Sequence, residues 1–239
     1  RNVVPFYELP VYRSTNLPDL PARARRGHAD ANGKFEDAPS FTINSSNIQL
    51  SGIPDKLIIF FRKPPSVLRC DDTDCFATVT NISLNFNNQA GLLSSMTPEQ
   101  LYRNSIQSGL ANMSWDEFCG STMSVSDGTE YGNSSLRTPY SGMGATQRFV
   151  IPPGTAGAPA QTGFLGFQQS PTTGTILVLN FAEVIQLTEE YYGPGSLGSF
   201  NLQVRLQVQN NHYDTWNPAP EQDEMVIMPM NSGMFVNER

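Results

Sequence analysis

The stretch from Cys70 to Cys75 carries the densest set of reactive side chains in this sequence of 239 residues, because two thiols flank three carboxylates. Such a set could ligate a cation or close a small disulfide loop. Its spacing matches neither a zinc knuckle nor an EF-hand, and no second Cys/His pair completes a metal site. We therefore interpret this stretch as an acidic turn between two strands and predict that it holds no structural metal.

The sequence contains only two histidines, His28 and His212. A metal site of the cupin type needs two or more converging histidines, so the sequence predicts none. His212 and Asp214 could be a fragment of a catalytic triad, but no serine lies in a Gly-x-Ser-x-Gly elbow, and we interpret both as solvated surface residues. Glycine-rich phosphate-binding motifs are absent as well. We predict no catalytic, cofactor-binding or metal site, and no enzymatic activity.

Cys119 and four aromatic residues are the remaining candidates for chemistry. Cys119 has no apparent histidine partner, which favours a small buried hydrophobic residue over a nucleophile. The aromatic residues could form a stacking platform for sugars or bases, but in a β-sandwich such side chains more often fill the core or a subunit interface. These residues are Trp115, Trp216, Tyr191 and Tyr192.

The charge balance argues against a nucleic-acid-binding face. The formal net charge is −7, whereas affinity for phosphates depends largely on lysine and arginine. The one dense basic cluster is Arg23, Arg25 and Arg26, which we interpret as a solvated loop; the alternative is an internal arm that touches the genome or a neighbouring subunit. No apolar run reaches about 18 residues, so we expect no membrane insertion.

Apolar residues alternate with polar ones over residues 200–209 and 81–87, which predicts half-buried strands of an antiparallel sheet. Residues 56–61 and 175–181 are apolar on both faces and predict strands that are covered on both sides. Further strands are predicted at 3–14, 42–50, 147–151 and 225–230. With 19 Gly and 18 Pro between such runs, a mostly helical protein is excluded.

Two short helices are predicted by capping boxes, one starting after Thr97 and stopping at Gly109, the other starting after Ser114 and stopping at Gly120. Three long connections are expected, at 16–40, 124–146 and 152–174. The predicted fold class is all-β: an antiparallel jelly-roll β-sandwich of about eight strands, with long loops and one or two short helices.

The segments 52–62 and 82–89 together resemble the second jelly roll of double-jelly-roll viral major capsid proteins, of the polinton, virophage and large-DNA-virus branch. Residues 177–187 and 192–201 are similar to the family's strand, Pro-Gly-Ser turn and following strand, and residues 228–238 to its closing strand. The resemblance covers about residues 41 to 239. It implies that the chain 1–239 is one jelly-roll domain, with a leading strand and long loop over 1–40 and the remainder over 41–239, in the C-terminal half of a larger capsid protein.

The resemblance further implies a structural subunit of an icosahedral capsid, found in the virion and assembled in the host cytoplasm or nucleus. Its expected partners are two further copies in a homotrimeric, pseudo-hexameric capsomer, neighbouring capsomers, and penton and minor or cement capsid proteins. No sequence-specific nucleic acid binding is expected. The alternatives are a single-jelly-roll vertex (penton) or minor capsid protein, and a non-viral carbohydrate-binding jelly-roll module.

Overall fold

The computed structural model describes residues 2–15, 17, 40–66, 76–129, 144–151, 161–181, 183–187, 193–209 and 223–237; for the strands between 121 and 171 it describes the backbone. These residues form thirteen strands and two helices. In chain order they are β1 (Asn2–Glu8), β2 (Tyr12–Ser14), β3 (Ser40–Asn44), β4 (Ile48–Gly52), β5 (Lys56–Arg62), β6 (Thr78–Phe86), β7 (Gln89–Leu92), α1 (Pro98–Gln107), α2 (Trp115–Phe118), β8 (Ser121–Thr129), β9 (Gly144–Ile151), β10 (Gln161–Pro171), β11 (Ile176–Asn180), β12 (Leu197–Gln209) and β13 (Glu224–Asn237).

Two antiparallel sheets face each other as a sandwich. One has the order β2-β13-β5-β11, and the other has β3 and β4, which pair with successive parts of β12, followed by β12, β6 and β7. If β3 and β4 count as one position, the sandwich has eight positions in two four-stranded sheets, the arrangement of a jelly roll. The predicted fold class is confirmed, and so is its strand number for the sandwich itself.

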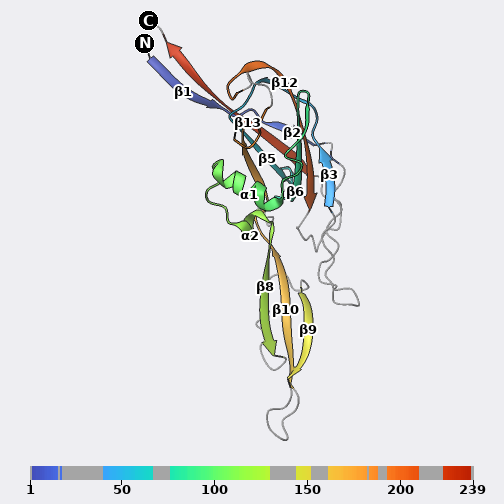
Figure 1. Ribbon diagram of the computed structural model, residues 1–239. Coiled ribbons are helices and arrows are strands. Elements are labelled where there is room, and N and C mark those ends of the chain that lie inside the picture. Colours follow the sequence, from blue (N-terminus) through green and yellow to red (C-terminus); the bar gives the residue numbers. More distant parts are fainter. Residues whose placement is uncertain are drawn as a thin grey trace.

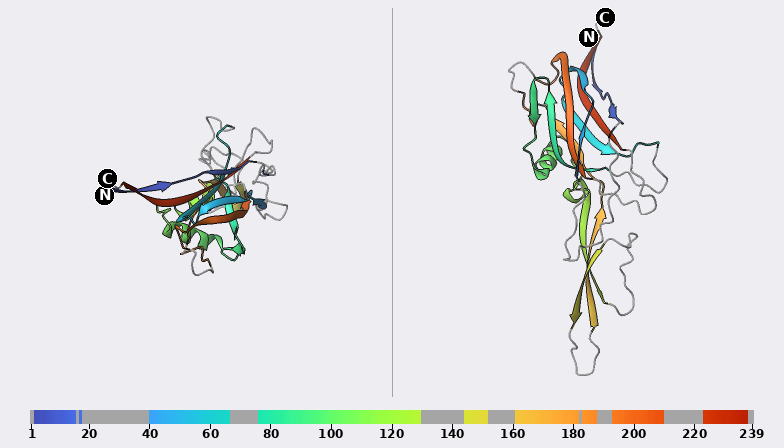
Figure 2. Two further views of the ribbon diagram at one scale, coloured as in Figure 1. Left: turned by 90° about the horizontal axis from the view of Figure 1, so that it is seen from above. Right: turned by 90° about the vertical axis from the view of Figure 1, so that its right-hand side faces the viewer.

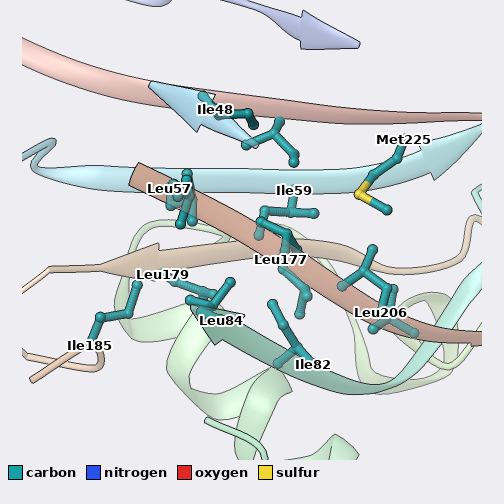
Figure 3. Packing of buried hydrophobic residues seen from close by; sticks show 14 of the residues in the cluster. Ile48, Leu57, Ile59, Ile82, Leu84, Leu177, Leu179, Ile185, Leu206 and Met225 are labelled. Atoms are coloured by element: carbon teal, nitrogen blue, oxygen red, sulfur yellow. The ribbon is translucent and has the colours of Figure 1, made fainter. Parts of the chain in front are cut away.

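The core lies between the two sheets. On β12, Phe200, Leu202, Val204, Leu206 and Val208 are all buried, while the residues between them are exposed. This is the predicted alternation, and β6 shows it too. Figure 3 shows side chains of β5, β6, β11, β12 and β13 meeting in one apolar cluster.

The two runs that are apolar on both faces are covered unequally. On β5 one face is fully buried, but Ile58 and Phe60 on the other are only half-buried. On β11 the outer face lies under α1, and the backbone N–H of Val178 donates to the hydroxyl of Ser105 at 3.2 Å. The outer face of β11 was expected to be covered, and in the structure it is covered by the helix α1.

Both helices begin at the predicted capping boxes. Thr97 and Ser114 are the N-caps, and each hydroxyl accepts a hydrogen bond from the backbone N–H three residues later. The side chains of Gln100 and Glu117 accept from the N-cap backbone in return. Local sequence alone was sufficient to predict where these helices start.

Two parts of the chain extend beyond the sandwich, at opposite ends (Figures 1 and 2). The projecting sheet consists of β8, β10 and β9 in that order. The terminal ribbon consists of residues 2–8 of β1 paired with residues 231–237 of β13, and Asn2 faces Asn237 at its tip. The sandwich thus carries one elongated element at each end.

Four sequence predictions are wrong in part. The expected long connections 124–146 and 152–174 contain most of β8 and all of β10, which pair over nine residues. The predicted single strand 3–14 is two strands, β1 and β2, and 42–50 likewise divides into β3 and β4. In β8, small polar residues prevail and leave no apolar period to detect, so only backbone pairing marks the strand.

Candidate functional site

Most of the residues considered for chemistry lie outside the described residues: the cluster Arg23, Arg25 and Arg26, His28, residues 70–75, Tyr191, Tyr192, His212, Asp214 and Trp216. Among the described residues, no three His, Cys, Asp or Glu side chains come together in a way that could hold a metal ion. Within that same part of the chain, no helix has the length and apolar character that crossing a membrane requires.

Cys119 caps the C-terminal end of α2 and is half-buried. Burial raises the pKa of its thiol to about 11, and the carboxylates of Asp116 and Glu99 add to this effect. A thiol with such a pKa is almost wholly protonated at neutral pH and is a poor nucleophile. The sequence predicted a small buried hydrophobic residue here, and the structure shows Cys119 only half-buried.

Trp115 packs with other aromatic rings rather than standing free. Its ring lies edge-on to Tyr102, with centroids 5.3 Å apart, and stacks with Phe118 at 6.2 Å. The Tyr102 hydroxyl donates to the carbonyl of Met113 at 3.1 Å. The cluster fixes α2 against α1, which confirms the packing role predicted for this residue.

The base of the projecting sheet is joined to the sandwich by a dense set of hydrogen bonds around α2. The buried hydroxyl of Thr175 donates to the carbonyl of Phe118 at 2.8 Å and accepts from the N–H of Val79 at 3.0 Å. The Thr172 hydroxyl donates to the carbonyl of Asp116 at 2.7 Å. These partners satisfy carbonyls that a helix C-terminus otherwise leaves free, and they tie the sheet to α2 and β6.

Gly174 lets the chain pass through this base. Its φ is +92°, and a Cβ built there would lie 1.9 Å from the carbonyl oxygen of Phe76. Its N–H donates to the carbonyl of Glu117 at 2.8 Å. Backbone atoms cannot yield as a flexible side chain can, so this position admits only glycine.

An ion pair between a partly exposed arginine and a buried glutamate joins β5 to the start of β13. The Arg62 guanidinium donates through Nε to the Glu224 carboxylate at 3.1 Å, and the Glu224 side chain is only 2% exposed. Arg62 also lies over the ring of Phe60, 5.5 Å from its centroid. Leaving a buried carboxylate without a partner is costly, and Arg62 supplies that partner.

The terminal ribbon exposes apolar side chains on both of its faces. In an antiparallel pair, two residues that lie opposite each other share a face. Val4, Phe6 and Phe235 therefore lie on one face of the ribbon, where the Phe6 ring covers Gly233. Val3, Pro5, Tyr7, Met234 and Val236 lie on the other. Of these, Phe235 is 65% exposed and Met234 is 74% exposed. Sequence reasoning missed this surface because it assigned these apolar residues to the sandwich; the signal was the lack of alternation in residues 3–7.

The described residues therefore offer contact surfaces rather than a reaction centre, and comparison with known proteins agrees. The model of the family "major capsid protein V20 C-terminal domain" matches residues 25–233. This chain belongs to that family. Members of the V20 C-terminal domain family are structural capsid proteins of virions, not enzymes. This excludes the non-viral carbohydrate-binding alternative and favours a major capsid protein over a vertex protein.

Individual relatives fit the family assignment. The putative capsid protein V20 of Sputnik virophage is 29% identical over 204 residues, which are 82% of this chain and 27% of that protein. A chain of the cryo-EM structure of the Sputnik virophage superposes with a TM-score of 0.62 at 24% identity, over 97% of this chain and 36% of that one. The crystal structure of the mavirus major capsid protein superposes with a TM-score of 0.54 at 11% identity, over 97% of this chain and 38% of that one.

The two solved structures share the fold with this V20-type domain. In each comparison the chain spans well under half of the relative, between 27% and 38% of its length. The predicted resemblance to virophage-type capsid proteins is confirmed.

Proposed function

We propose that this chain is the C-terminal jelly roll of a longer major capsid protein, and that three copies of that protein form one capsomer. The relatives are longer than this chain, which covers 27% to 38% of them, and the matching family is described as a C-terminal domain. We keep the proposed division into a leading strand and loop over 1–40 and a remainder over 41–239.

The observation that carries the proposal is the projecting sheet with its rigid base. The hydrogen bonds of Thr172 and Thr175 join the base of this sheet to α2, so the sheet is attached to the sandwich at several points. A three-stranded sheet that projects beyond the sandwich is placed where it can contact neighbouring molecules, which supports a role in subunit contacts (Figure 1).

Cyclic association requires two different complementary surfaces on each subunit. The projecting sheet and the side of the sandwich can supply them, because they lie on separate parts of the molecule (Figure 1). The further partners we propose are neighbouring capsomers, penton proteins and minor or cement capsid proteins, which would contact the remaining outer surfaces.

Native mass spectrometry of the purified capsid polypeptide tests the trimer. We expect a mass of three polypeptides, and electron micrographs of particles with pseudo-hexagonal capsomers. A polypeptide that stays monomeric at micromolar concentration and in assembly buffer would refute the proposed trimer.

A further inference from the structure

The terminal ribbon is the part of the structure that neither the core nor the projecting sheet explains. Over residues 2–8 and 231–237 it contains a single charged residue, Glu8. All seven residues of β1 are exposed, and the last four of β13 are exposed as well. Strands that face water on one side place polar residues there, whereas this ribbon has apolar side chains on both faces.

A ribbon of two strands with no packed face is marginally stable on its own. Among the described strands, none other pairs with residues 231–237, and no layer of the sandwich covers either face. Exposed apolar surface of this kind marks a contact with another protein surface. Because both faces are apolar, the partner must cover both of them. A flat surface would cover one face only and would leave either Met234 or Phe235 exposed to water.

We propose that the terminal ribbon is a docking arm, inserted into an apolar groove of the region that precedes it in the same capsid polypeptide. The inference rests on the proposed function, in which this chain is the C-terminal part of a longer protein. The preceding polypeptide would lead through Arg1 into the ribbon at its tip, where Asn2 pairs with Asn237. A partner tethered at the tip is present at a high effective concentration, which a separate molecule would lack.

The ribbon also joins this docking to the core of the domain. Residues 224–230 of β13 pair with β5 inside the sandwich, and the same strand continues as residues 231–237 of the ribbon. An arm built on a continuous strand transmits its position to the sandwich without a hinge. Docking of the ribbon therefore orients the sandwich relative to the preceding region.

Photo-crosslinking in the complete capsid polypeptide tests the inference. Benzoylphenylalanine would replace Phe235 on one face of the ribbon, Met234 on the other, and Gln203 on the exposed face of β12 as the control. All three side chains are exposed within this chain, so the replacements should leave the core of the domain undisturbed. We expect Phe235 and Met234 to crosslink to peptides that precede the ribbon in the same polypeptide, without a gain in mass on a denaturing gel, and Gln203 to give no such crosslink.

Other results separate the possible failures. Crosslinks from Phe235 or Met234 to a second copy, which double the mass, or to another virion protein would overturn the inference and leave the proposed function intact. Absence of crosslinks at both positions would also overturn it. If the polypeptide in particles has a mass of only 26.3 kDa, the mass of this chain, the proposed C-terminal position fails and the docking arm fails with it.

Discussion

Both halves of β13 contain a run of large apolar residues, but the two runs have opposite environments. Residues 225–230 read Met-Val-Ile-Met-Pro-Met and lie in the sandwich, where Met225, Val226 and Ile227 are buried. Residues 234–236 read Met-Phe-Val and are exposed on the terminal ribbon. Both halves pair with other strands, so backbone hydrogen bonding does not distinguish them.

The difference between the two halves is the presence of an opposing layer. The first half has β5 and β2 beside it and the sheet of β12 and β6 across the core. Of the described strands, β1 alone lies beside the second half. Burial of an apolar strand thus depends on what packs on its face, and composition shows only that a face needs cover. In the ribbon, the need for cover is the signal of a partner.

The largest expected effect comes from the same substitution made on each side of this comparison. Phe61 on β5 lies opposite Met225 and is fully buried, whereas Phe235 lies on the ribbon. We expect Phe61→Ala to lower the free energy of unfolding of this chain by about 3 to 5 kcal/mol, because it leaves a cavity in the core. Phe235→Ala should change it by about 0.5 kcal/mol or less.

Urea-induced unfolding of the two variants measures both values. Equal losses would break the comparison, since they would mean that the ribbon is packed within this chain. In the longer capsid polypeptide the comparison becomes sharper: there Phe235→Ala should also destabilise, while Phe61→Ala keeps its effect.

A second comparison sets a glycine of the packed part of the molecule, Gly174, against a glycine of the terminal ribbon, Gly233. At Gly174 a methyl group would meet backbone at a positive φ, whereas at Gly233 it would meet the ring of Phe6, at 2.5 Å. The Phe6 ring is about half exposed and can turn into solvent. We expect Gly174→Ala to cost about 2 to 4 kcal/mol, because backbone strain and overpacking add. Gly233→Ala should stay within about 0.5 kcal/mol.

Thermal unfolding of the two alanine variants, each against the unmodified chain, gives this difference. A melting temperature that is unchanged for Gly174→Ala would show that the base of the projecting sheet can shift, against the tight packing described above.

The sequence predicted those parts of the fold whose signals are local or periodic. Apolar and polar residues alternate over 200–209 because one face of this strand packs on the core. The capping boxes of Thr97 and Ser114 involve only residues of the same helical turn, so the sequence shows them directly. Of the projecting sheet, part of β9 was predicted, over residues 147–151, whereas β8 and β10 were missed because their apolar and polar residues do not alternate. The exposure of Phe6 and Phe235 was missed because an apolar strand indicates burial somewhere, without indicating which molecule provides it.

The smallest expected effect concerns α2, which lies where the projecting sheet joins the sandwich (Figure 1). The Ser114 backbone N–H donates to the Glu117 carboxylate at 2.7 Å and its hydroxyl donates at 2.9 Å. The backbone hydrogen bond lowers the pKa of Glu117 most, and the hydroxyl hydrogen bond lowers it further below its ordinary value. Because the folded pKa is depressed, the resulting stability is present above the unfolded pKa and is lost as the pH falls through the folded one.

Glu117→Gln keeps a side-chain acceptor for the cap but removes the titration. We therefore expect the unmodified chain to be slightly more stable than Glu117→Gln at neutral pH, and this advantage to disappear in acid, below the folded pKa. Urea unfolding of both proteins at a series of pH values measures the difference directly, and Glu99, whose pKa is also lowered, is the same in both. A difference that stays constant down to about pH 2.5, well below the ordinary glutamate pKa, would mean that the Glu117 charge does not stabilise α2. The stability of α2 would then come from its aromatic packing and from the hydrogen bonds that Thr172 and Thr175 donate to its carbonyls.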